Sequence, residues 1–140
     1  MVVTNEDKNI SLAAVDALSQ LEHGIDSCAF VLSKSKTILK KVAEEIKKLS
    51  KELSRSDQIE PAIENISLIK CNSDNDIINM INSCAPEHLV LLDEDFPKYI
   101  DSINNAGSVF CGKKSPVAFG DYASGTCLLY TSDAADDGVG

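Results

Sequence analysis

The fold is decided by residues 29–53, which read AFVLSKSKTILKKVAEEIKKLSKEL. The first four residues are continuously apolar, which is typical of a strand that is buried on both faces. Beyond them, apolar residues recur at helical spacing and form one stripe, with lysines on the opposite, solvated side. The stripe contains Ile38, Leu39, Val42, Ile46, Leu49 and Leu53, and the lysines are Lys40, Lys41, Lys47 and Lys48. This stretch therefore predicts a buried strand followed by an amphipathic helix.

Helical and strand-like patterns alternate on both sides of this stretch. On its N-terminal side, Gly24 ends a predicted helix in the manner of a C-cap. The apolar stripe of that helix is Leu12, Val15, Leu18 and Leu21. On the C-terminal side we expect a shorter helix over 57–65, with Pro61 tolerated in its first turn. Short apolar runs predict further strands at 66–69, 89–92 and 108–111.

Two more helices are expected between these later strands. Ser73 or Asp74 is suited to cap the first of them, since both side chains accept hydrogen bonds from backbone amides. The first helix carries Ile77, Ile78 and Ile81, and the second, over 96–104, places Phe96, Ile100 and Ile103 on one side. Four strands alternating with helices predict an α/β fold with an open, doubly wound, mostly parallel sheet, preceded by a helix. This is an incomplete Rossmann-like arrangement, and the absence of G-x-G-x-x-G gives no independent indication of a dinucleotide site.

Composition places the chain among globular intracellular proteins. Its 140 residues are 44% hydrophobic and 25% charged, which suits one domain with a real core. The 22 acidic residues outnumber the 13 basic ones, which argues against a nucleic acid or an anionic membrane as partner. No stretch approaches the length of a membrane span. The five cysteines are odd in number and form no C-x-x-C, which indicates reduced thiols and a cytoplasmic location.

Three short segments could carry chemistry. Gln20 and His23 are three residues apart on a predicted helix, so they share a face and could bind one metal ion, or they are ordinary surface polarity. Glu87 and His88 lie between a helix and a buried strand and could form an acid/base pair, or they are an exposed glutamate and a capping histidine. Asp121 lies between two glycines, in a loop that either presents its carboxylate to a ligand or is simply hydrophilic.

Taken together, four segments resemble the histidinol dehydrogenase family, in its order and at its spacing. The resemblance covers residues 5–126. The segments are Leu18-Ser19-Gln20-Leu21-Glu22-His23-Gly24, Ala85-Pro86-Glu87-His88-Leu89, Asn105-Ala106-Gly107-Ser108-Val109-Phe110 and Gly120-Asp121-Tyr122-Ala123-Ser124-Gly125-Thr126. An interaction module with coincidental Glu-His pairs would require four motifs to match in order by chance.

The resemblance implies a function and a set of site residues. Enzymes of this family oxidise L-histidinol to L-histidine with two NAD molecules, through an aldehyde that stays bound. By resemblance, Gln20, His23 and Asp121 are three zinc ligands, and with His88 they contact the substrate. We therefore expect these three ligands to converge on one point. Glu87 and His88 correspond to the catalytic acid/base pair. A homodimer is expected for the full-length family member.

The chain also departs from the family pattern. The family's preceding region, with most of its NAD contacts, and its fourth zinc ligand, a histidine supplied by the partner subunit, have no counterpart here. Cys127 and Leu128 stand where the family has Asn and a substrate-contacting His. We expect a partial catalytic domain over 1–126, followed at 127–140 by a divergent tail that is non-native or disordered. The chain is expected to be inactive alone, and the alternative is an inactive metal-binding α/β domain that retains only the fold.

Overall fold

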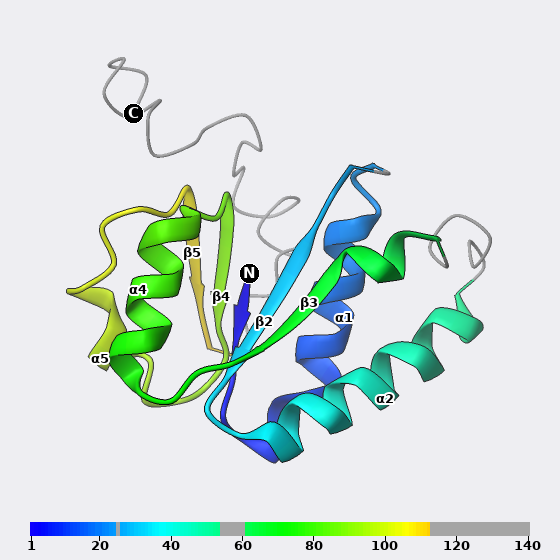
Figure 1. Ribbon diagram of the computed structural model, residues 1–140, viewed down its shortest axis with the longest axis horizontal. Helices are drawn as coiled ribbons and strands as arrows, with labels where there is room; N and C mark the ends of the chain where they lie inside the picture. Colours follow the sequence, from blue (N-terminus) through cyan, green and yellow to red (C-terminus); the bar gives the residue numbers. More distant parts are fainter. Residues whose placement is uncertain (25, 54–60, 113–140) are drawn as a thin grey trace.

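A computed structural model describes residues 1–24, 26–53 and 61–112 (Figure 1). Within these residues, five parallel strands form one sheet in the order β3-β2-β1-β4-β5. The strands are β1 (Val2–Val3), β2 (Ala29–Ser33), β3 (Ile66–Lys70), β4 (His88–Leu91) and β5 (Ser108–Cys111). The open, doubly wound α/β fold that the sequence predicts is confirmed.

Helices cover both faces of the sheet. The α-helices are α1 (Ile10–Leu21), α2 (Lys36–Glu52), α4 (Asp74–Cys84) and α5 (Pro97–Ile100), and two short 3-10 helices are η1 (Asp7–Asn9) and η2 (Ile63–Asn65). In Figure 1, α1 and α2 lie to the right of the sheet, and α4 and α5 lie to its left. In the described part of the chain, no helix is long and apolar enough to cross a membrane.

The strands alternate their side chains between two hydrophobic cores. Val2, Val31 and Val90 pack with α1 and α2, whereas residues one position further along each strand pack with α4 and α5. Those residues are Val3, Leu32 and Leu91. Because both faces are covered, the inner strands β2 and β4 are largely apolar, with the runs AFVL and LVL, whereas the edge strand β3 (ISLIK) is only partly buried.

Strand β1 lies at the centre of the sheet, although no sequence pattern predicts it. Val2 pairs with Val31 of β2 on one side and with Val90 of β4 on the other. A strand of two residues is too short to produce a recognisable apolar run. As a consequence, the prediction that a helix precedes the sheet is wrong in detail, since α1 lies between β1 and β2.

Helix α1 faces the sheet with small residues. Ala13, Ala14 and Ala17 are fully buried, whereas Val15, which we assigned to the apolar stripe, is 43% exposed. Alanine allows the helix axis to approach its neighbours closely, so the buried face is centred on alanines. Of the predicted stripe, Leu18 and Leu21 are buried and Leu12 packs against the same core, so only the assignment of Val15 is wrong.

The remaining helices follow the prediction with two changes. Ser73 is the N-cap of α4, and its side chain accepts a hydrogen bond from the Asp76 amide at 3.1 Å. Helix α5 is shorter than the 96–104 prediction, with Tyr99 buried and Ile100 39% exposed. Of the helix expected over 57–65, residues 57–60 lie outside the described residues, and the chain is helical from Pro61 into η2.

Candidate functional site

The candidate catalytic and metal-binding residues that the structure describes lie at the amino end of the sheet. Gln20 is the penultimate residue of α1, and His23 lies just beyond this helix, before β2 begins. His88 is the first residue of β4, and Glu87 directly precedes this strand. Because β2 and β4 both flank β1 and run parallel to it, their amino ends lie at the same edge of the sheet.

A tight turn sets the direction in which the chain enters β4. Helix α4 ends at Cys84, and its C-cap, Ala85, has the left-handed conformation with φ 45° and donates its amide to Ile81 O at 2.9 Å. Such a conformation costs about 1–2 kcal/mol for a residue with a Cβ atom. Pro86 follows, and its carbonyl accepts from the Gly107 amide at 2.9 Å. The start of β5 therefore holds the turn in place, and the chain bends at Glu87 before β4.

His88 is the most enclosed of the candidate residues. Its side chain is only 2% exposed. The ring packs edge-on against Phe110 of β5, with ring centroids 5.9 Å apart. The backbone carbonyl of His88 accepts from the Met1 nitrogen at 2.7 Å, which ties its main chain to the start of β1. Strand pairing and aromatic packing thus fix the position of the imidazole.

The end of α1 brings two further polar side chains to this imidazole. Gln20 Oε1 lies 3.3 Å from His88 Nδ1. The rings of His23 and His88 have centroids 6.3 Å apart, with an interplanar angle of 57°. The structure therefore brings Gln20, His23 and His88 together from segments separated by more than 60 positions. Asp121 lies outside the described residues.

Gln20 and His88 border a cavity of about 320 Å³. Gln20, Glu87 and His88 line it, together with Asp26, Cys28 and Cys84. A volume of this size is at the lower end of the range typical of small-ligand sites. No sequence motif contains the last three residues. Their place in the sequence is the one indication that they lie near the site. Asp26 and Cys28 precede one predicted parallel strand, and Cys84 shortly precedes another.

The described donors fit part of a metal site. Gln20 supplies an amide oxygen and His23 an imidazole, and both are ligand types that zinc accepts in proteins, the imidazole far more often. Within residues 1–24, 26–53 and 61–112, no group of three or more His, Cys, Asp or Glu side chains is arranged to hold a metal ion. The described chain thus offers two neighbouring donors, one of them an amide.

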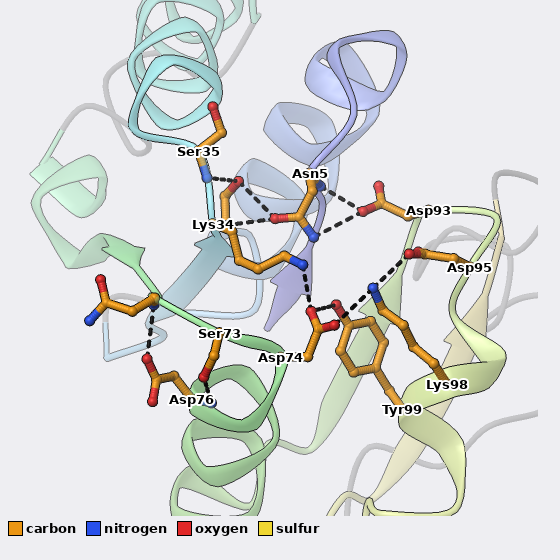
Figure 2. A network of polar contacts seen from close by, with 12 residues as sticks. Asn5, Lys34, Ser35, Ser73, Asp74, Asp76, Asp93, Asp95, Lys98 and Tyr99 are labelled. Carbon is orange, nitrogen blue, oxygen red and sulfur yellow. Dashed lines mark hydrogen bonds and ion pairs between the residues drawn. The ribbon is translucent and has the colours of Figure 1, made fainter.

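The opposite, carboxyl end of the sheet carries a polar network of its own (Figure 2). Asp93, which follows β4, is 4% exposed. Its carboxylate accepts from Thr4 Oγ1 at 2.6 Å, from Asn9 Nδ2 at 3.0 Å, and from the Asn5 amide and Nδ2 at 2.6 and 3.2 Å. In open α/β sheets, ligands usually bind at this end, where the strand order reverses. Here the reversal lies between β1 and β4, and Asp93 already bridges it.

A second group of charges lies beside this network. Asp74, at the start of α4, contacts Lys34 Nζ at 2.7 Å and Lys98 Nζ at 3.2 Å, and it accepts from the Tyr99 hydroxyl at 2.9 Å (Figure 2). The hydrogen bond from Lys34 lowers the pKa of Asp74 to about 2. Burial, followed by the bond to Asp74, raises the pKa of Tyr99 to about 12. Lys98 also pairs with Asp95 at 2.6 Å, so two carboxylates balance two lysines, as expected for a structural ion-pair network.

Comparison with known proteins agrees on one family. The family model described as histidinol dehydrogenase matches residues 1–136. Histidinol dehydrogenase of Pseudoalteromonas translucida is 39% identical over 126 residues, and that of Methanosarcina mazei is 33% identical over 126 residues. Each match covers 90% of this chain and 29% of the relative. The crystal structure of histidinol dehydrogenase from Elizabethkingia anophelis superposes with a TM-score of 0.87 at 36% identity, covering 97% of this chain and 32% of that one.

Proposed function

This chain belongs to the histidinol dehydrogenase family, and on that basis we propose that it is part of an NAD-dependent enzyme that oxidises L-histidinol, through L-histidinal, to L-histidine. The observation that carries the proposal is the convergence of Gln20, His23 and His88 beside a cavity that Glu87 also lines. Because the chain spans only 29% of the length of the relatives it matches, the activity proposed is that of the whole protein.

His88 is proposed as the group that removes a proton from the substrate oxygen at each oxidation. An alkoxide releases hydride far more readily than an alcohol, so a base held at the reacting oxygen accelerates both steps. Burial and the contacts with Gln20 and Phe110 support this role, since they hold the imidazole in one place. A preorganised base loses little free energy to reorientation during the reaction.

Glu87 is proposed as the base that activates water. The aldehyde must become its hydrate before a second hydride can leave, and a carboxylate can take the proton from the attacking water. Glu87 is half-buried and borders the cavity, so water can reach it. Its neighbour His88 is buried, and this difference in access supports a division of work between the two residues.

Gln20, His23 and Asp121 would hold a zinc ion, and with His88 they would position the substrate. Zinc, when bound, would anchor and polarise the substrate without itself changing oxidation state. NAD would accept the hydride at each step. We further propose that the whole protein acts in the cytoplasm as a homodimer.

A segment exchange tests the proposal. Residues 1–126 would replace the matching segment of the Pseudoalteromonas translucida enzyme, and formation of NADH from L-histidinol would be measured. We expect activity from the exchanged enzyme, and its loss in the same enzyme carrying His88→Asn. A folded exchanged enzyme that binds zinc without oxidising L-histidinol would instead favour an inactive metal-binding domain.

A further inference from the structure

We propose that Gln20 is a positioning residue that fixes the tautomer of His88, with the proton on Nδ1 and the lone pair on Nε2. The atom of Gln20 that faces the ring is Oε1, 3.3 Å from Nδ1. An amide oxygen can only accept a hydrogen bond, so Nδ1 must donate. A neutral imidazole carries a single N–H, and Nε2 is then the nitrogen able to take a proton. The catalytic meaning of this arrangement rests on the proposed function, whereas the tautomer is inferred from the contact between Gln20 Oε1 and His88 Nδ1.

The surroundings of His88 restrict the ring to one orientation. Exchange of the two nitrogens would require the ring to turn over inside a site where the side chain is 2% exposed. Phe110 packs edge-on against one part of the ring, and the main chain is held by pairing with β1 and β5. The hydrogen bond to Gln20 therefore acts on a ring that packing has already placed.

The position of Gln20 is equally well determined. It lies in the last turn of α1, between Leu18 and Leu21, which are 3% and 4% exposed. These leucines anchor the end of the helix in the core, so the amide is presented to His88 from a rigid element. An amide oxygen has two lone pairs, so Oε1 can accept from Nδ1 and still serve as a metal donor. Positioning His88 and binding zinc are therefore compatible roles for one side chain.

The chain is unusually convenient for a direct test, because it contains only two histidines. Nitrogen-15 labelled histidine and long-range proton–nitrogen correlation spectra distinguish the two tautomers, since protonated and unprotonated ring nitrogens have very different shifts. The spectra would be recorded on the 140-residue chain without metal, at pH about 8.5, where an ordinary imidazole is neutral. His23→Gln identifies the signals of His88. We expect a single His88 tautomer with the proton on Nδ1.

Two substitutions at Gln20 separate positioning from packing. Gln20→Leu removes the acceptor, and we expect His88 to shift to a mixture of tautomers. Gln20→Glu keeps an oxygen acceptor and should restore the Nδ1–H form. Ser11→Ala, at the exposed start of the same helix, is the control and should leave the His88 spectrum unchanged. Dispersed amide spectra would establish that each variant is folded.

The outcomes distinguish this inference from the proposed function. A His88 with its proton on Nε2 in the unsubstituted chain would overturn the inference, because Gln20 would then be donating its amide to Nδ1. An unchanged Nδ1–H tautomer in folded Gln20→Leu would overturn it as well. Neither result affects the segment exchange, which can still yield activity. Conversely, an inactive exchanged enzyme with the Nδ1–H tautomer would reject only the catalytic role.

Discussion

The two ends of the parallel sheet use their polar side chains in opposite ways. At the carboxyl end, Asp93 accepts hydrogen bonds from three side chains and one main-chain amide, and Asp74 is paired with two lysines. At the amino end, Gln20, Glu87 and His88 border a cavity of about 320 Å³. Polar groups that satisfy one another stabilise a fold, whereas polar groups arranged around a cavity can bind and transform a ligand.

This contrast matters because the usual rule for open α/β sheets places ligands at the carboxyl end. In this chain the strand order reverses between β1 and β4. Asp93, which follows β4, accepts hydrogen bonds from Thr4 and Asn5, which follow β1, so a protein side chain occupies the position where a ligand would usually bind. The candidate chemistry lies at the other end, where α1 and α4 finish and β2 and β4 begin. The comparison therefore predicts that substitutions at the amino end change activity more than stability, and that those at the carboxyl end do the reverse.

The largest effects are expected at Glu87 and His88, measured in the segment-exchanged enzyme. His88→Asn should slow oxidation of both L-histidinol and L-histidinal by about 10²–10⁴-fold, because a proton leaves oxygen before each hydride. Glu87→Gln should mainly slow the aldehyde step, because water is activated only there. Steady-state rates with each substrate decide between these roles. Equal losses with both substrates in the Glu87 variant would show that the division of work is wrong.

At the carboxyl end, Asp93→Ala should be strongly destabilising. The substitution leaves the amide and hydroxyl groups of Thr4, Asn5 and Asn9 without their shared acceptor in a buried site. We expect a loss of about 3 kcal/mol or more, measured by urea unfolding. Asp95→Ala is the matched control, since its carboxylate is exposed and contacts only Lys98 among the pairs described, and it should cost less than about 1 kcal/mol. Similar losses of stability in the two variants would show that the buried Asp93 network stabilises the fold no more than a surface ion pair does.

Much of this architecture could be predicted from the sequence because the strands are apolar on both faces and the helices on one. The predictions that failed concern residues whose pattern is weak. Strand β1 has two residues, and α1 is buried through alanines, which carry little hydrophobic signal. Val15 is exposed for the same reason, since the alanine face and not the valine turns towards the sheet.

The candidate site was only partly predictable. Motif resemblance led to Gln20, His23, Glu87 and His88, but periodicity alone left each of them with an ordinary structural explanation. Their convergence depends on the strand order, which places β4 next to β1, a strand that was not predicted. The order of strands in a sheet cannot be deduced from a local sequence pattern. For the same reason, the position of Cys28 and Cys84 ahead of two strands points to a shared cavity only once the strand order is known.

A smaller effect is expected at the turn that enters β4. Ala85 has a positive φ of 45°, a conformation that glycine adopts without steric cost. Ala85→Gly should therefore increase the free energy of unfolding by up to about 1 kcal/mol, with part of the gain offset by the greater entropy of the unfolded chain. Ala85→Val should destabilise, since a β-branched residue is strained further in this region. Denaturant midpoints compare the two, and a less stable glycine variant would show that the turn stores no strain.

The smallest effect belongs to Asp74 and depends on pH. Its pKa is lowered to about 2 in the folded chain, chiefly by the hydrogen bond from Lys34, against an ordinary value of 3.8. A carboxyl group with a depressed pKa stabilises the fold above its unfolded pKa, and this contribution is lost as pH falls from about 4 through about 2. Because the Asp74 side chain is 40% exposed, solvent screens its ion pairs, and the total should stay below about 1 kcal/mol.

Asp74→Asn isolates this contribution, because the amide oxygen can still accept from Tyr99. The difference in unfolding free energy between the two proteins should be constant between pH 5 and pH 7 and should shrink on acidification towards pH 2. Salt at about 1 M should reduce the difference at pH 7, since the Debye length is then only about 3 Å. A difference in unfolding free energy that persists at pH 2 and in high salt would indicate that Asp74 acts through packing. Side-chain packing would then stabilise the carboxyl end of the sheet more than charge does.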